Sequence, residues 1–388
     1  MARDCAKTRR PSTTVSALFA LLIMLSTLGS FSFVPTASYA ASSPSNQQLN
    51  PLLVDQAGQS SVNFVLWSKS CGLKKCFRLE RIDMANDTSS FVTAPPLSDV
   101  PRIWMGGLEQ LDFANPFDGY ELLDPGYGKI ARLYATFDGG LSWHHEDFVA
   151  NQTVERITST PSTFYAIGGV NCSKANELCQ RWQLSSSPVT ESRWTKGSRP
   201  YEWGHDSIYP AVAAFDDRVW VTAQEQAKPY LTLFATSTNS GRTFSVRSIP
   251  NMPSVAGCGI AATSVTTIWA QCDDGNMAGD IEYSNDGGAH WRNLANETLG
   301  EFFFGTFDAE SNNFAFFVNG EHSSDFCELI DGAGKTVIVG KPPYYQLSNL
   351  SFTNQSQGLA MSSPIGSLGR QILYETTDGG ANWKRLFG

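Results

Sequence analysis

Short apolar runs alternate with polar residues along most of this chain, and their lengths are those of β-strands. Within residues 211–249, the runs AVAAF, DDRVWVTA, YLTLFAT and FSVRSI are separated by segments rich in Asp, Gly, Asn and Ser. Such runs, bounded by turn residues, predict four strands and three turns in about 45 residues. Helical periodicity does not extend beyond about two turns in these units. We therefore expect an all-β fold.

An eight-residue phrase recurs in four copies, TFDGGLSW, STNSGRTF, SNDGGAHW and TTDGGANW. The copies end at Trp143, Phe244, Trp291 and Trp383. Their acid or amide residues are Asp138, Asn239, Asp286 and Asp378, separated by 101, 47 and 92 residues. Because the first and last separations are close to twice the second, each predicts a further copy midway.

Weaker copies of the phrase occur at the expected midpoints. LIDGAGKTVIV supplies Asp331, and LSSSPVTESRW ends at Trp194. A third weak copy, RIDMANDTSSF, covers residues 81–91. The repeat therefore extends over most of the chain.

A second phrase precedes the box and has the form F-x-N-x-x-x-G. Residues 108–122 align without a gap on residues 347–361, so that Phe113 matches Phe352. Phe113 precedes Asp138 by 25 residues, and Phe352 precedes Asp378 by 26 residues. Two phrases held at one separation indicate a structural repeat.

Four-stranded units of this length, repeated around an axis, predict a β-propeller. The units at residues 58–95, 101–150, 154–197, 208–250, 257–297, 302–342 and 346–388 predict seven blades, with six or eight as alternatives. The predicted domain is residues 58–388. We expect the ring to close by packing of the first blade on the last, or alternatively by a strand from Asn50 to Gln56 that completes the closure.

We expect each box to form the turn between the third and fourth strands of a blade. The acid then accepts hydrogen bonds from backbone N–H groups, and the glycines supply positive φ angles. One carboxylate is too few ligands for calcium or phosphate, so the boxes predict neither a metal nor a cofactor site. The predicted structural residues are Asp138, Gly139, Gly140, Trp143, Asn239, Gly241, Phe244, Asp286, Gly287, Gly288, Trp291, Asp331, Asp378, Gly379, Gly380 and Trp383.

The S/T-x-D-G-G-x-x-W boxes resemble the Asp-box (BNR) repeats of sialidases, of sortilin-type receptors and of the photosystem II stability/assembly factor family. The F-x-N-x-x-x-G phrase is most similar to the assembly-factor branch, which implies an exported, non-enzymatic, seven-bladed propeller. The sialidase branch implies glycoside hydrolysis by three Arg, a Tyr and Glu pair and an Asp. Only Arg102, in VPRIW, falls in a phrase that matches this set.

The N-terminus predicts export. Arg9 and Arg10 precede an apolar run over residues 15–34, and Ser38-Tyr39-Ala40 has the pattern of a cleavage site. We predict a signal peptide over residues 1–40, with an uncleaved membrane anchor as the alternative, and a linker over residues 41–57. Loss of residues 1–40 removes four bases and Asp4, leaving 24 Lys and Arg against 36 Asp and Glu. This acidic balance argues against nucleic acid as a partner.

The cysteines predict disulfides and an oxidising compartment. Cys71 with Cys76, and Cys172 with Cys179, bracket loops between strand-like runs, while Cys258 and Cys272 lie in successive runs. A zinc site with four thiolates is the weaker alternative, because the spacings do not match a zinc knuckle. Cys327 is left over, and we expect a buried thiol there.

We expect a secreted or cell-envelope propeller without catalytic activity of its own. It would act as a monomer and bind a protein or glycan partner through its loops. A sialidase-like glycoside hydrolase and a purely structural envelope protein are the alternatives. The loop PYEWGHDSIYP, residues 200–210, combines aromatic residues with a His and an Asp, which is typical of a recognition surface, with structural packing between blades as the equal alternative.

Overall fold

The computed structural model describes residues 49–71, 74–96, 110–123, 131–148, 152–172, 179–200, 207–225, 231–248, 257–273, 279–295, 307–311, 314–318, 327–340, 346–363 and 371–387. These residues all belong to one unit, Gln47–Gly388, which is distinct from Met1–Asn46. The predicted signal segment, residues 1–40, lies outside the described residues. In the described ranges, no helix has the length and apolar character needed to cross a membrane.

The described residues form 28 strands and no helix. The strands of the first two groups are β1 (Asn50–Gln56), β2 (Val62–Cys71), β3 (Lys74–Asp83), β4 (Thr88–Val92), β5 (Gln110–Phe113), β6 (Gly119–Leu123), β7 (Arg132–Thr136) and β8 (His144–Glu146). The next two groups are β9 (Gln152–Ser159), β10 (Thr163–Cys172), β11 (Cys179–Pro188), β12 (Thr195–Lys196), β13 (Ser207–Phe215), β14 (Arg218–Glu225), β15 (Leu231–Ser237) and β16 (Ser245–Ser248).

The remaining strands form three further groups of four. They are β17 (Gly257–Ala262), β18 (Ile268–Asp273), β19 (Gly279–Ser284), β20 (Arg292–Ala295), β21 (Phe307–Ser311), β22 (Phe314–Val318), β23 (Cys327–Asp331), β24 (Thr336–Gly340), β25 (Gln346–Phe352), β26 (Gly358–Ser363), β27 (Ile372–Thr376) and β28 (Lys384–Phe387). Named strands pair only in the antiparallel sense. The expectation of an all-β propeller with four-stranded antiparallel blades is confirmed.

The blade count differs from the seven expected. Among the described strands there are six sheets, of which five have four strands and one has eight. The eight-stranded sheet arises because β11 and β13 pair at Cys179 and Ser207, which joins the third and fourth groups along the chain. The structure therefore has six blades, one of them of double width, and the expectation of seven separate blades is wrong.

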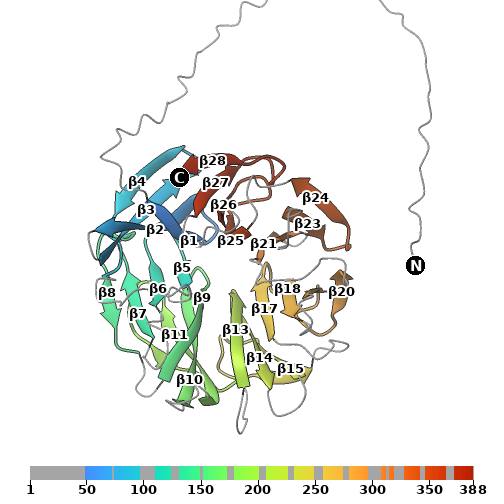
Figure 1. Ribbon diagram of the computed structural model, residues 1–388. Helices are drawn as coiled ribbons and strands as arrows, with labels where there is room; N and C mark the ends of the chain where they lie inside the picture. Colours follow the sequence, from blue (N-terminus) through green and yellow to red (C-terminus); the bar gives the residue numbers. More distant parts are fainter. Residues whose placement is uncertain are drawn as a thin grey trace, which may run out of the picture. The chain divides into compact units, whose positions relative to one another are not determined.

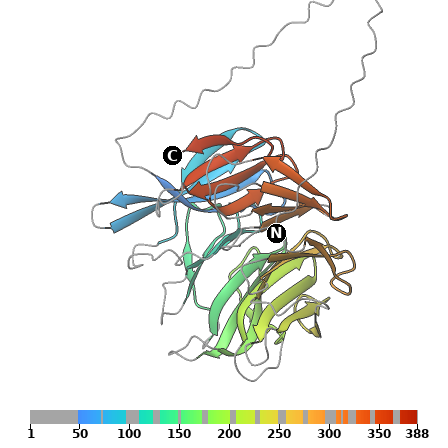
Figure 2. The same cartoon turned by 45° about the vertical axis from the view of Figure 1, so that its right-hand side comes forward.

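The sheets follow one another in chain order, and the last lies beside the first (Figure 1). The first strand of each group contacts the first strand of the next, through β1, β5, β9, β13, β17, β21 and β25, and β25 contacts β1 again. Figure 2 shows the last sheet, in red, against the first, in blue. The contacts between first strands thus form a closed cycle.

The hydrophobic core lies between successive groups of strands rather than inside any one sheet. Val219 and Val221 of β14 pack with residues of the third group, whereas Trp220 packs with Ile268 of the fifth. Both faces of the strand are therefore buried. Successive side chains point to opposite faces of the sheet, and each face packs against a different neighbouring group. The same arrangement joins the first group to the last through Trp67 and Met361.

The F-x-N-x-x-x-G phrase forms the first turn of a group. Phe113 pairs across the strands with Gly119, and Phe352 pairs with Gly358. A Cβ atom on Gly119 would come within 2.4 Å of the Phe113 ring, and one on Gly358 within 2.6 Å of the Phe352 ring. Glycine is therefore required because the aromatic ring covers its Cα atom.

Side chains of one first strand hydrogen-bond to the main chain of the next. The Asp55 carboxylate accepts from the Phe113 amide at 2.7 Å, and Gln110 Oε1 accepts from the Ile157 amide at 2.7 Å. Asn349 Oδ1 accepts from the Val54 amide at 3.3 Å, which links the last group to the first. These bonds satisfy amides on strand edges that face a different sheet.

Closure of the ring uses packing of the first group on the last. Strand β1 pairs with β2 in the first sheet, and the last sheet consists of β25 to β28 alone. Strand β1 also contacts β25, β26 and β27 of that last sheet, so Asn50 to Gln56 take part in the closure from the first sheet. Strand β1 also lies within residues 41–57, so the ordered fold includes part of the segment expected as a linker.

Replacement of Asp55 tests the contact between the first two groups. Asp55→Ala leaves the Phe113 amide without its carboxylate acceptor, so we expect a loss of about 1–3 kcal/mol in the free energy of unfolding. Urea denaturation measures this loss. Asp147→Ala, which removes a carboxylate with a fully exposed side chain, is the control and should change stability little. Equal stability of both variants would show that the Asp55 bond contributes nothing.

Candidate functional site

The four strong boxes form turns between the third and fourth strands of their groups, at β7–β8, β15–β16, β19–β20 and β27–β28. In each, a Ser or Thr hydroxyl donates to the acid or amide two residues later, at 2.9 to 3.0 Å. The same hydroxyl accepts a hydrogen bond from the backbone N–H of the second central residue of the box, which is a glycine in all four, at 2.8 to 2.9 Å. The acid or amide then accepts the backbone N–H four residues later at 2.8 to 2.9 Å.

The residue four positions after the acid also bonds through its side chain. This residue is Ser142, Thr243, His290 or Asn382, and the bonds measure 2.6 to 2.8 Å. Asp286 therefore accepts from Ser284 and twice from His290. Desolvation raises the pKa of Asp286, but these hydrogen bonds outweigh that effect and lower it to about 2. The carboxylate stays charged throughout the physiological range.

The two central residues of each box have positive φ angles, from +58° at Ser240 to +89° at Gly380. The second glycine also touches the preceding group. A Cβ on Gly140 would meet Leu79 and Val92 at 2.9 Å, one on Gly241 would meet Leu184 at 2.2 Å, and one on Gly288 would meet Phe234 at 2.2 Å. Glycine is needed there for both backbone conformation and close packing.

The first central amide of each box ties it to the first turn of its own group. Gly139 donates to Phe117 O at 2.7 Å, Gly287 to Thr266 O at 2.8 Å, and Gly379 to Ser356 O at 2.8 Å. In the fourth group Ser240 donates to Asp217 O at 2.7 Å. The box therefore fixes two turns at the same end of the sheet.

The aromatic residues that end the boxes pack on neighbouring rings. Trp143 lies edge-on to Phe113 at 6.1 Å, Trp383 to Phe352 at 6.1 Å, and Trp291 to Phe234 at 5.1 Å between ring centroids. Phe244 packs against the apolar cluster between the third and fourth groups. Asp331 also lies at a turn, between β23 and β24, where its carboxylate accepts the Ala333 and Lys335 amides.

Two of the three predicted disulfides are observed. Cys71 bonds to Cys76 within the hairpin of β2 and β3, and Cys258 bonds to Cys272 between β17 and β18. These four cysteines are therefore not available as the thiolates of a zinc site. The Cα atoms of Cys172 and Cys179 are paired across β10 and β11, but their side chains and that of Cys327 lie outside the described residues.

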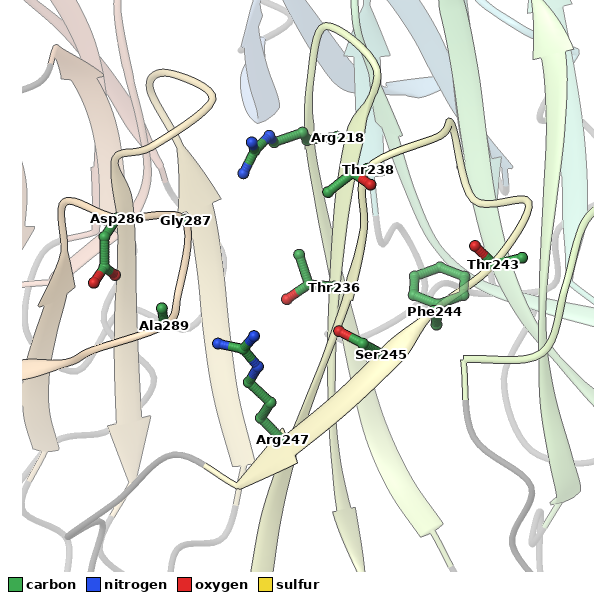
Figure 3. A pocket seen from close by; sticks show the side chains of 10 residues that line it. All are labelled: Arg218, Thr236, Thr238, Thr243, Phe244, Ser245, Arg247, Asp286, Gly287 and Ala289. Carbon is green, nitrogen blue, oxygen red and sulfur yellow. The ribbon is translucent and has the colours of Figure 1, made fainter.

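A pocket of about 270 Å³ lies between the fourth and fifth groups of strands. One wall is formed by β14, β15, β16 and the box between β15 and β16, and the other by the next box, at residues 286–289 (Figure 3). Its lining residues are Arg218, Thr236, Thr238, Thr243, Phe244, Ser245, Arg247, Asp286, Gly287 and Ala289. Two boxes therefore frame the pocket from opposite sides.

Strand register places both arginines on one face of the sheet. Thr236 pairs with Trp220 on one side and with Ser245 on the other, and Arg247 pairs with Phe234. Because side chains alternate along a strand, Arg218 lies on the same face as Trp220, and Arg247 on the same face as Ser245. Figure 3 shows both guanidinium groups directed toward the box that contains Asp286 and Gly287.

Arg218 lies directly over the next box. A Cβ atom on Gly287 would be 2.8 Å from Arg218 Nη1, so the end of the Arg218 side chain lies close to the Gly287 backbone. The indole N–H of Trp220 donates a hydrogen bond to the main-chain oxygen of the same glycine, Gly287, at 3.2 Å. Among the described residues, no carboxylate forms an ion pair with Arg218 or Arg247. Within the described part of the chain, the pocket thus presents two guanidinium groups without a carboxylate ion-pair partner.

Sequence reasoning did not identify this pocket. Arg218 occupies the first position of its second strand, where Gly119 and Gly358 stand in two other groups. This replacement of a repeated glycine by an arginine was the sequence feature that could have indicated the pocket. Arg102, the candidate for a sialidase-like clamp, and residues 201–206 of the candidate recognition loop lie outside the described residues.

A fully buried carboxyl group without a hydrogen-bond partner among the described residues was also not anticipated. Glu121 on β6 is fully buried, and neither carboxylate oxygen has a hydrogen-bond partner in the described part of the chain. Its cross-strand neighbours Leu111 and Tyr134 belong to an apolar cluster, and desolvation raises the pKa of Glu121 to about 8. Burial also raises the pKa of Asp112 to about 6, although Ser159 donates to it.

No protein-family model and no curated protein matches this chain. The Asp-box and sialidase-like family assignment is therefore not confirmed. Solved structures similar to the chain include the β-propeller domain of the Trilobed protease from Pyrococcus furiosus, which is described as having an open velcro topology. That similarity has a TM-score of 0.55 and 10% identity, and covers 87% of this chain and 97% of that chain.

Two further similar structures are whole enzymes. Puromycin hydrolase matches with a TM-score of 0.56 and 14% identity over 87% of this chain and 53% of that chain. A prolyl endopeptidase matches with a TM-score of 0.58 and 10% identity over 87% of this chain and 50% of that chain. The chain thus spans about half the length of these enzymes.

These neighbours correct the expectation that the chain is not an enzyme. The propellers that it resembles belong to a protease, a hydrolase and a peptidase, so the similar structures are associated with enzymes. At such low identity the likeness shows the fold alone. The activities are those of the neighbours.

The boxes predict a difference between two substitutions at Asp138. Asp138→Ala removes the acceptor of Ser142 N and Thr136 Oγ1, so we expect a loss of about 1 kcal/mol or more in unfolding free energy. Asp138→Asn should cost clearly less, because Asn239 makes the equivalent bonds in the fourth group. Chemical denaturation of both variants gives the comparison. If both lost equal stability, the shared acceptor would not be the stabilising feature.

The raised pKa of Glu121 predicts that stability falls with pH. Between its ordinary pKa of 4.5 and about 8, the folded protein holds a proton that the unfolded chain releases. Unfolding free energy should therefore decrease by up to about 1.4 kcal/mol per pH unit in that window. Above pH 8 this contribution no longer changes.

Glu121→Gln should remove this pH dependence. Measurements between pH 6 and 8 are the most informative, because the Asp112 transition lies at or below that range. The matched control is Glu191→Gln, at a residue that is exposed. An unchanged pH slope in Glu121→Gln would contradict the assignment of the buried proton to Glu121.

Proposed function

We propose that this propeller is an exported recognition module that binds a protein or glycan partner through an anionic group held between Arg218 and Arg247. The observation that carries the proposal is the presence of two guanidinium groups in one pocket without an ion pair among the described residues. Arginine offers planar, paired donors that match the oxygens of an anionic group.

The arrangement of the pocket supports binding rather than structure. The guanidinium group of Arg218 lies close to Gly287, and Arg247 lines the same space. The hydroxyl groups of Thr236, Thr243 and Ser245 line the same space and supply further donors and acceptors. A pocket with oriented polar groups of this kind favours a specific anionic ligand.

The surrounding charge is consistent with recognition of a particular group. The whole chain has a formal charge of −9, so a locally cationic pocket stands out from its surroundings. An acidic surface disfavours nucleic acid, whose binding depends on clustered bases. The disulfides Cys71–Cys76 and Cys258–Cys272 fit an oxidising compartment, and we propose that the protein acts there as a monomer.

Binding to immobilised polyanions tests the proposal. The wild-type protein should bind a surface coated with polyglutamate or with polygalacturonate. Arg218→Gln/Arg247→Gln should weaken that binding at least roughly tenfold, because each charge-assisted bond contributes about 1.5–3 kcal/mol. Biolayer interferometry measures the dissociation constants.

The matched control is Arg193→Gln/Arg385→Gln, which removes two exposed arginines outside the pocket. It should bind as the wild type does. Melting temperatures of both double variants verify folding. Equal affinity of the wild type and the pocket variant for both surfaces would refute an anion site at this position.

A further inference from the structure

We infer that the anionic group is the carboxylate of an Asp or Glu side chain, presented by an extended acidic segment of a partner protein that lies along β16. This inference rests on the proposed function and names the chemistry of its partner. Three features of the described residues carry it: the charge of the pocket, its size, and the free edge beside it.

The charge of the pocket fits a singly charged group. Arg218 and Arg247 contribute two positive charges, and Asp286 contributes one negative charge that its box keeps ionised. The sum of one positive charge matches a carboxylate. A doubly charged phosphate would leave an excess negative charge beside Asp286, and like charges in contact disfavour binding.

The size of the pocket fits a side chain. Its volume of about 270 Å³ lies just below the range of roughly 300–1,000 Å³ that is typical of pockets for whole small-molecule ligands. An acidic side chain that enters it would be surrounded by arginine and hydroxyl groups. Charged anchors of this kind, placed in a pocket of the partner, supply much of the affinity in protein interfaces.

The edge of the sheet offers the rest of the surface. Strand β16 is the last strand of its sheet, so the outward main-chain groups have no strand partner among the described residues. Ser245 and Arg247 line the pocket, whereas Val246 is 47% exposed. A peptide strand added to β16 would direct alternate side chains toward the pocket and could use these main-chain groups. The positive charge of Arg247 beside this edge is complementary to an acidic strand.

Fluorescence anisotropy with a labelled, capped octapeptide of alternating Glu and Thr tests the inference. The wild-type protein should bind it, and the peptide with Gln in place of Glu should bind at least roughly tenfold more weakly. A peptide of the same sequence in which alternate residues are N-methylated keeps its carboxylates. It loses the backbone N–H groups that would donate hydrogen bonds to β16. It should also bind more weakly, because β16 would lose hydrogen-bond partners.

Protein variants locate the site. Arg218→Gln/Arg247→Gln should abolish the difference between the Glu and Gln peptides, and Arg193→Gln/Arg385→Gln should preserve it. Val246→Pro would remove a main-chain N–H in β16. Because this variant also affects the fold, the N-methylated peptide provides the independent measurement of strand pairing.

Competing anions separate this inference from the proposed function. If galacturonate oligomers or inorganic phosphate bind in an Arg218- and Arg247-dependent manner while the Glu peptide does not, the anion site stands and the acidic peptide is the wrong partner. If the wild-type protein forms dimers that the pocket variant loses, the occupant is a second copy of this chain. If no anion distinguishes the wild type from the pocket variant, both the inference and the proposed function fail.

Discussion

The hydrogen-bonded box turn is the interaction on which the rest of the structure depends. A Ser or Thr hydroxyl and an Asp or Asn side chain together satisfy the amides of a turn whose central residues have positive φ angles. That backbone brings a glycine against the preceding group, as Gly288 lies against Phe234, and ties the turn to the first turn of its own sheet. Each box therefore sets both the shape of its sheet and the packing on its neighbour.

The pocket follows from the same geometry. Successive boxes contribute to its two walls, and the guanidinium group of Arg218 lies close to Gly287 of the second box. The first glycine of these boxes lies near a main-chain oxygen, Pro116 O at Gly139, Val265 O at Gly287 and Gln355 O at Gly379. At Gly287 the end of the Arg218 side chain lies close as well, and among the described residues it forms no ion pair.

The periodic features could be predicted from the sequence, because the local hydrogen bonds that create them depend on a few adjacent residues. The boxes and the Phe113–Gly119 pair are of this kind. The blade count depends on one long-range pairing, Cys179 with Ser207, which no local pattern encodes. Strand β1 pairs with the next strand in sequence, β2, but it lies before the first unit that the repeat defines, so the repeat does not mark it. The pocket joins residues of two repeats, so its position required the register of β14, β15 and β16.

Hydrogen exchange at the box turns tests the central claim most directly. Gly140, Gly241, Gly288 and Gly380 lie in turns next to exposed residues, yet each amide donates to a Ser or Thr hydroxyl and is buried. Exchange measured by mass spectrometry should be slow for these four amides, as slow as for amides of the adjoining strands. Exchange at the rate of unprotected turn amides would show that the boxes do not hold the sheets together.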